Sequence, residues 1–156
     1  ASGEQAERLA ALNDFGLRVK PIGPVIGHAS AFKMCYAGIT KGLWALATEN
    51  LVACRALGIE EPFMAEFQES QSALLGMFSK NIPGIPPKAL RWIPEMEEIA
   101  ATFQSVGLTP RMLEGAADMY RLMQSSPLGA ETPDNRTRGT DLPDVVKVMA
   151  EALKKA

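Results

Sequence analysis

HASAFKMCYAGITKGLWALATENLVACRAL, residues 28–57, contains no proline and is followed at once by Gly58. Most of its residues favour or tolerate the α-helix, and glycine commonly ends one, so the stretch predicts a single helix about 45 Å long. Apolar side chains surround this predicted helix on most sides. A helix of that kind is typically buried at the centre of a bundle or in a dimer, so we expect a mainly α domain built round it.

Small residues recur along one side of the predicted helix at spacings of three or four positions: Ala31, Cys35, Gly38, Gly42 and Ala45. Residues at these spacings share one face of a helix, and small side chains allow a second helix to come close. The pattern therefore predicts a packing surface for another helix.

The rest of the chain predicts shorter helices separated by turns. Periodicity and flanking glycine, proline and capping residues predict helices over residues 4–13, 61–70, 71–78, 88–105, 110–124 and 142–154. The core-facing side of the fourth helix is expected to carry Leu90, Ile93, Met96, Ala100 and Phe103. NIPGIPP, residues 81–87, predicts a stiff loop, and residues 125–140 predict a surface loop or an arm.

LRVKPI, residues 17–22, lies between Gly16 and Gly23 and predicts a single β-strand. No second convincing strand follows it, and a lone strand leaves its backbone hydrogen-bonding groups unpaired. We therefore expect this strand either to pair with another chain or to belong to a sheet whose other strands lie outside the sequence.

The charge balance argues against nucleic acid and membrane partners. The chain has 16 Lys plus Arg and 18 Asp plus Glu, so there is no positive excess to neutralise a phosphate backbone. Charged residues interrupt the longest hydrophobic region before it could span a bilayer. We expect a cytoplasmic protein.

The two cysteines and the single histidine do not predict a disulfide or a metal site. Cys35 and Cys54 fall in one predicted helix, about 28 Å apart, so they are expected to be free thiols in the core. His28 has no neighbouring Cys or His at a spacing typical of zinc ligands.

Lys33 lies in a mildly polar stripe of the long helix with Ser30, Tyr36 and Thr40, because steps of three and four residues return to one face. In one interpretation Lys33 packs its aliphatic stem and extends its ammonium to water. In the other, partial burial beside small residues disfavours the charged form, which suits the lysine to proton transfer. Composition does not separate the two.

A resemblance bears on this choice. Residues 27–34, with Gly27 and the Lys33-Met34 pair, and the segment YAGITKG, residues 36–42, resemble the start of the C-terminal domain in the β-hydroxyacid dehydrogenase family. That family includes 6-phosphogluconate dehydrogenase and 3-hydroxyisobutyrate dehydrogenase. RWIPEMEEIA (91–100), GLTP (107–110) and GAADMY (115–120) are similar to a 6-phosphogluconate-dehydrogenase-like branch that has no settled substrate.

The resemblance implies a fold and a division into domains. Residues 1–26 look like a short αβ remnant of a Rossmann nucleotide-binding domain, namely its last helix and strand. Residues 27–156 look like the helical substrate-binding and dimerisation domain, similar to the C-terminal domain of 6-phosphogluconate dehydrogenase.

The resemblance also implies an activity. Family members oxidise a small 3-hydroxy acid with NAD or NADP, and the lysine at the position of Lys33 takes or gives the hydroxyl proton. Ser30, Tyr36 and Thr40 are then candidates for substrate binding, and a homodimer is expected. The arm with Arg136 and Arg138 would reach a neighbouring subunit, as similar arms do in some relatives.

Two departures limit what the resemblance implies. Many relatives have asparagine four residues after the lysine, where this chain has Ala37. Decarboxylating relatives have glutamate seven residues after it, where this chain has Thr40, so 6-phosphogluconate decarboxylation is not implied.

The sequence contains no Gly-x-Gly-x-x-Gly turn of the kind that holds a dinucleotide pyrophosphate. Gly23 and Gly27 precede the long helix and, with Ser30, could hold an anion there or form an ordinary turn. We therefore expect the C-terminal part of a larger enzyme, with the cofactor bound mainly by a domain absent from this chain. The alternatives are a standalone helical module that dimerises or binds a small acid without catalysis, and a helical interaction protein with no ligand.

Overall fold

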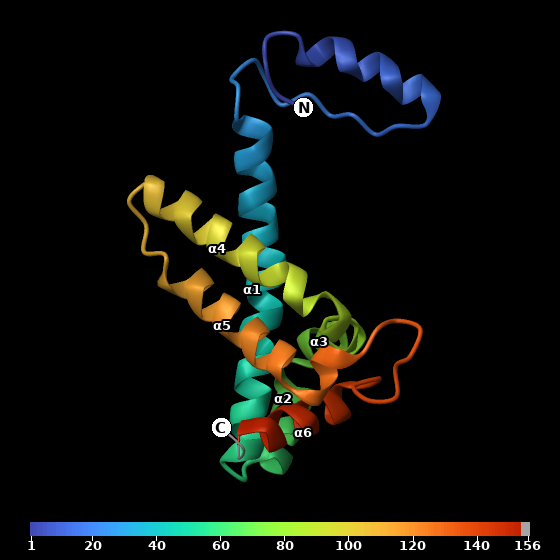
Figure 1. Ribbon diagram of the computed structural model, residues 1–156, viewed down its shortest axis with the longest axis vertical. Helices are drawn as coiled ribbons and strands as arrows, with labels where there is room; N and C mark the ends of the chain where they lie inside the picture. The colour runs from blue at the N-terminus through green and yellow to red at the C-terminus, as the bar shows by residue number, and fades with distance from the viewer. Residues whose placement is uncertain (154–156) are drawn as a thin grey trace.

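The computed structural model describes residues 1–153 and is organised round one long helix, α1, which spans His28–Ala56 (Figure 1). Gly27 precedes α1 with φ 93° and Gly58 follows its end with φ 75°, a left-handed conformation that glycine adopts without strain. The long helix predicted over residues 28–57 is confirmed.

Five further α-helices pack on α1 in two groups. α4 (Ala89–Ser105) and α5 (Arg111–Ser125) form an antiparallel pair that crosses the middle of α1 (Figure 1). α2 (Glu60–Ser70), α3 (Ser72–Asn81) and α6 (Leu142–Leu153) surround its C-terminal half. The helices predicted from the sequence match these bounds within a few residues.

The predicted small-residue surface of α1 is confirmed where α4 and α5 cross it. A Cβ atom added at Gly38 would lie 3.4 Å from both Ile99 and Phe103 of α4, and one at Gly42 would lie 3.4 Å from Leu113 of α5. The face of α4 that meets the core differs from the prediction at one position. Leu90 is exposed, and Trp92 is buried in its place.

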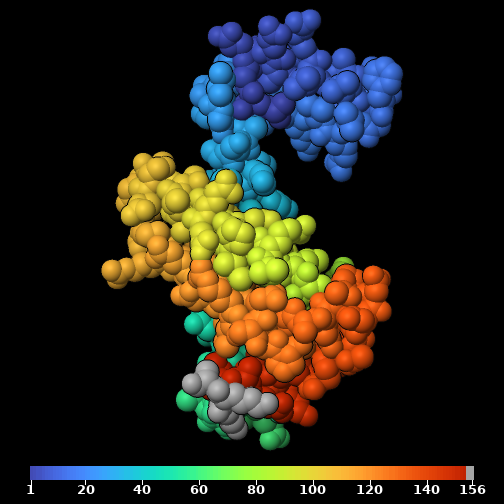
Figure 2. Space-filling model, in the orientation of Figure 1, coloured from blue at the N-terminus to red at the C-terminus, as the bar shows by residue number. Residues whose placement is uncertain are grey.

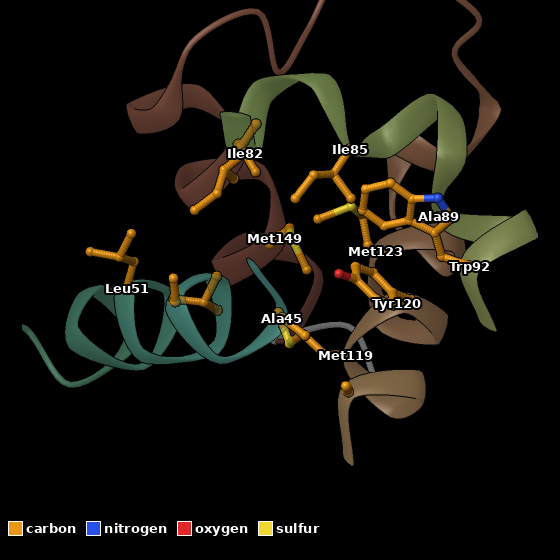
Figure 3. Packing of buried hydrophobic residues seen from close by; sticks show 14 of the residues in the cluster. Ala45, Leu51, Ile82, Ile85, Ala89, Trp92, Met119, Tyr120, Met123 and Met149 are labelled. Atoms are coloured by element: carbon orange, nitrogen blue, oxygen red, sulfur yellow. The ribbon is translucent and has the colours of Figure 1, made fainter. Parts of the chain in front are cut away.

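The segment 81–87 is more regular and more deeply buried than a surface loop. It forms two short 3₁₀ helices, η2 (Ile82–Gly84) and η3 (Pro86–Lys88). Both helices have proline in their first turn, where no N–H is needed. Ile82 and Ile85 are fully buried and point toward Met149 and Met123 in the core (Figure 3).

The predicted strand at residues 17–22 is wrong, and the described residues contain no strand. Residues 6–15 form a 3₁₀ helix, η1 (Ala6–Phe15), and the chain then returns without a ladder partner. Val19 N–H donates to the side chain of Asn13, and Ile22 N–H donates to Ala1 C=O. These hydrogen bonds satisfy backbone N–H groups of the segment locally. The described chain supplies no second strand long enough to pair with it.

The first turns of α1 form a narrow waist between residues 1–27 and the remaining helices (Figure 2). Ser2 Oγ accepts a hydrogen bond from Ala29 N–H across 3.0 Å, which ties the N-terminal unit to the start of α1. The single chain does not bury this half of α1, so its expected burial in a dimer stays a prediction. Phe32, Tyr36 and Ile39 are 63%, 66% and 72% exposed in the single chain.

Residues 125–140 fold back on their own domain instead of extending as an arm. η4 (Pro127–Ala130) places Leu128 in the core, fully buried. Arg138 then binds the carboxylate of Asp144 at the start of α6 in the same chain, and a contact with a neighbouring subunit stays a prediction. No helix of the described chain has both the length and the apolar content to cross a membrane.

Candidate functional site

The stripe predicted from the sequence lies on the exposed half of α1. Ser30, Lys33 and Tyr36 are exposed, and Thr40 is half-buried. Thr40 Oγ1 donates to the Tyr36 carbonyl oxygen across 3.1 Å, so only its lone pairs remain for a ligand. The stripe therefore offers an ammonium and two free hydroxyl groups along one side of one helix.

Two grooves of the domain lie away from this stripe. A groove of about 320 Å³ lies between α4 and α5 beside Glu97 and Arg121, and one of about 440 Å³ lies between Arg55 and Glu151. Neither includes a residue of the stripe.

The glycine turn before α1 is not organised as an anion site. Gly23 and Gly27 both have positive φ, as a tight turn requires. The N–H of Ala29 is already bonded to Ser2 Oγ, however, and the N–H of His28 to Val25 C=O. The residues present do not form a cradle for a dinucleotide pyrophosphate.

Four residues from α1 and α4 form a cluster of charged and aromatic side chains, which we call the Lys41 cluster: Lys41, Arg91, Trp92 and Glu95. Lys41 Nζ forms an ion pair with Glu95 Oε2. Arg91 Nε lies 3.8 Å from the other carboxylate oxygen of Glu95. Lys41 Nζ also lies 5.2 Å from the centroid of the Trp92 ring, within the range of a cation–π contact.

Lys41 is the most perturbed cation of this region. Burial lowers the pKa of Lys41 from its usual value, and the positive charges of Arg91 and Lys33 lower it further. Lys33 and Lys41 lie eight residues apart on the same side of α1, about 12 Å along its axis. Lys33 is therefore electrostatically coupled to the cluster.

The cluster is anchored to the core through α5. Tyr120 donates a hydrogen bond from its hydroxyl to the Lys41 carbonyl oxygen across 2.6 Å. The Tyr120 ring packs edge-on against Trp92, with centroids 5.4 Å apart, and both rings lie among the buried residues (Figure 3). Burial raises the pKa of the Tyr120 phenol well above its usual value.

Sequence analysis did not identify Lys41, Arg91 and Glu95 as one site. Two signals were available: the eight-residue spacing of Lys33 and Lys41, and the spacing of Arg91 and Glu95 one turn apart on a helix. Neither signal shows that α4 crosses α1 at Lys41.

No group of His, Cys, Asp and Glu within residues 1–153 has the arrangement of a metal site. Cys35 and Cys54 are both free thiols, as expected. Cys54 is buried, but Cys35 is exposed, so the expectation that both lie in the core is wrong for Cys35.

The match to a domain family covers the middle of the chain. Residues 55–123 match DUF1932, described as a domain of unknown function. This segment includes α2 to α4 and most of α5, and hence Arg91 and Glu95, whereas Lys33 and Lys41 precede it.

Two solved structures resemble this chain. A conserved hypothetical protein from Sinorhizobium meliloti 1021 shares 25% identity with a TM-score of 0.78, over 97% of this chain and 50% of its own. The conserved protein MTH1747, of unknown function, shares 27% identity with a TM-score of 0.66, over 79% of this chain and 48% of its own. The structure of MTH1747 is described as similar to 3-hydroxyacid dehydrogenases.

A curated relative is an uncharacterized 28.5 kDa protein in the 7S RNA 5′ region of Methanothermus fervidus. It is 26% identical over 121 residues, which cover 77% of this chain and 48% of the relative. The chain thus spans about half the length of the relatives it matches. Together the matches confirm the mainly α fold and the resemblance to the C-terminal domain of 3-hydroxyacid dehydrogenase-like proteins.

Proposed function

We propose that this chain is the helical substrate-binding and dimerisation part of an NAD(P)-dependent oxidoreductase that acts on a 3-hydroxy acid-type substrate. The observation that carries the proposal is the relationship of its helical domain to 3-hydroxyacid dehydrogenase-like proteins. Residues 27–156 would form the substrate-binding domain, and residues 1–26 would belong to the nucleotide-binding half. The waist at the start of α1 agrees with a boundary there.

Lys33 is the proposed proton donor and acceptor. It is exposed on α1, and no ion pair within residues 1–153 uses its ammonium. As a free amine it would take the proton of the substrate hydroxyl while hydride leaves the same carbon, and the 3-oxo acid would form. In the reverse direction its ammonium would return the proton to the carbonyl oxygen.

NAD or NADP, held mainly by a domain outside this chain, would accept the hydride. The residues of this chain would orient the substrate for that transfer. Ser30 and Tyr36 each present an exposed hydroxyl on the side of Lys33, and Thr40 can accept but not donate a further hydrogen bond.

We further propose that two chains dimerise through the first half of α1. Phe32, Tyr36 and Ile39 form an exposed apolar surface there, and the Phe32 and Tyr36 rings stack with centroids 6.5 Å apart. Sedimentation analysis tests this proposal. Ile39→Glu should shift the protein toward monomer, whereas Leu57→Glu, equally exposed at the far end of α1, should not.

The experiment for catalysis uses the full-length protein with a panel of 3-hydroxy acids and each nicotinamide cofactor. Lys33→Met should lower the turnover number at least 100-fold, because general acid–base catalysis typically contributes two to four orders of magnitude. Lys80→Met, at the exposed end of α3, is the matched control and should retain wild-type turnover. Wild-type turnover in Lys33→Met would remove Lys33 from the mechanism.

The second candidate is a non-catalytic helical dimerisation or small-acid-binding module. The exposed apolar side chains of Phe32, Tyr36 and Ile39 on α1 favour it. It predicts that the full-length protein reduces neither cofactor with any acid, while dimerisation or acid binding persists.

A further inference from the structure

Positive charge exceeds negative charge where α1 and α4 cross. Lys33, Lys41 and Arg91 are three cations, and Glu95 is the carboxylate that the structure pairs with the last two. Lys88 adds a fourth cation, with its Nζ 5.9 Å from the centroid of the Trp92 ring. The positive charges of Arg91 and Lys33 both disfavour the charged form of Lys41, so a bound anion would reduce the repulsion among these cations.

Glu95 binds its two cations unequally. Its contact with Lys41 is direct, and both side chains are mostly buried. Arg91 Nε is 3.8 Å away, and the Arg91 side chain is 72% exposed. The Lys41–Glu95 pair is therefore a fixed element, whereas most of the guanidinium donors of Arg91 remain open to solvent.

The fixed element also holds Arg91 in place. Glu95 lies one helical turn after Arg91 on α4, so its carboxylate limits the positions that the Arg91 guanidinium can take. Lys41 is itself anchored through its backbone by Tyr120 and through its ammonium by the Trp92 ring. Arg91 thus presents a planar set of N–H donors, the geometry that oxyanions bind in pairs.

We propose that Arg91, positioned by the Lys41–Glu95 pair, binds an oxyanion group of the substrate. Carboxylate and phosphate groups share this chemistry, and either could be the bound group. The inference rests on the proposed function for the identity of the ligand as substrate. The anion site itself depends only on the Lys41 cluster.

The test follows the indole signal of Trp92 by NMR in the full-length protein with ¹⁵N-labelled tryptophan. The chain has two tryptophans, Trp44 and Trp92, and Trp44→Phe assigns their signals. Inorganic phosphate and sodium acetate are titrated separately at constant ionic strength. A saturable shift with either anion supports the site, and the anion that binds more tightly identifies the group.

Substitutions distinguish a specific role of Arg91 in anion binding from a general effect of positive charge. Arg91→Ala should weaken anion binding at least tenfold, and Arg91→Lys should restore part of it. Arg111→Ala removes an exposed arginine at the start of α5 and should leave binding unchanged. No saturable shift with either anion, or equal binding by Arg91→Ala and wild type, would overturn the proposal.

The experiments test the anion site and the proposed function separately, so one can be contradicted without the other. Anion binding is measured without cofactor, so it does not require turnover. Where turnover is found, Arg91→Ala should raise KM at least tenfold with kcat changed less than threefold, whereas Lys33→Met should lower kcat. An unchanged KM in Arg91→Ala contradicts the anion site but leaves the role of Lys33 intact.

Discussion

Tyr120 of α5 donates its hydroxyl proton to the carbonyl oxygen of Lys41 on α1, 79 residues earlier in the chain. The bond joins the core to Lys41, the partly buried lysine of the Lys41 cluster. It holds the antiparallel pair of α4 and α5 at a fixed position along α1, so the arrangement of Arg91 and Glu95 beside Lys41 depends on it.

Removal of this bond should lower stability by a small, measurable amount. Tyr120→Phe keeps the buried ring and loses the hydrogen bond, and we expect a loss of about 1 kcal/mol in the free energy of unfolding. Urea denaturation measures it. Tyr36→Phe is the control, since Tyr36 is exposed, and it should leave stability unchanged. Equal stability of Tyr120→Phe and wild type would show that the bond contributes nothing.

Gly129 in η4 should not tolerate any side chain. A Cβ atom there would lie 1.9 Å from the backbone oxygen of Gln124, far inside van der Waals contact. Gly129→Ala should therefore shift the backbone of η4, displace the buried Leu128 and lower the thermal unfolding midpoint by several degrees.

Gly76→Ala is the matched control for Gly129→Ala. Gly76 lies within α3 and an added Cβ meets nothing within 4 Å. Alanine favours the helix over glycine by up to about 1 kcal/mol, so this variant should be as stable as wild type or more stable. A stable Gly129→Ala protein would contradict the packing of η4.

Gly38 sets how closely α4 approaches α1. Gly38→Leu places a large side chain against Ile99 and Phe103, and we expect overpacking to cost roughly 1–3 kcal/mol. Gly115→Leu, on the exposed side of α5 with nothing within 4 Å, should cost nothing. The denaturant midpoints of the two variants measure this difference in stability. A greater loss of stability in Gly115→Leu than in Gly38→Leu would contradict the close approach of α4 to α1 at Gly38.

Asp144 should make stability depend on acid pH. The hydrogen bonds from the Arg138 guanidinium and from Gly139 N–H, the latter 2.6 Å long, lower the pKa of the Asp144 carboxyl. A lowered folded-state pKa stabilises the fold above the unfolded pKa, about 3.9, and this contribution is lost as pH falls below about 4.

Urea midpoints between pH 2.5 and pH 6 test the contribution of Asp144. The wild-type midpoint should fall more steeply below pH 4 than that of Asp144→Asn. Asp134→Asn, in the exposed loop before α6, should retain the wild-type dependence. Identical profiles for Asp144→Asn and wild type would show that the carboxylate does not contribute.

The elements that local sequence determines were predicted well. The bounds of α1 follow from the absence of proline and from Gly58, and the close approach at Gly38 and Gly42 follows from their small size. The prediction of a strand at residues 17–22 was wrong. The segment has no partner strand in the described chain, and its backbone forms local hydrogen bonds with Asn13 and Ala1 instead.

The candidate site was predictable only in the part that lies on one helix. Lys33 and its stripe share a face of α1, which the helical period determines. The Lys41 cluster joins residues about fifty positions apart, and their proximity depends on the point where α4 crosses α1. No local pattern specifies that point, so Arg91 and Glu95 could not be assigned from the sequence.

Chemical rescue of a Lys33→Ala variant tests the central claim most directly. The rate of NAD(P)H formation is measured for the full-length protein, with the 3-hydroxy acid that the wild type oxidises and with increasing methylamine. We predict a turnover at least 100-fold below wild type that rises with amine concentration, because the added amine replaces the missing proton acceptor. Wild-type turnover in Lys33→Ala, or a folded but inactive variant that no amine restores, would contradict the account.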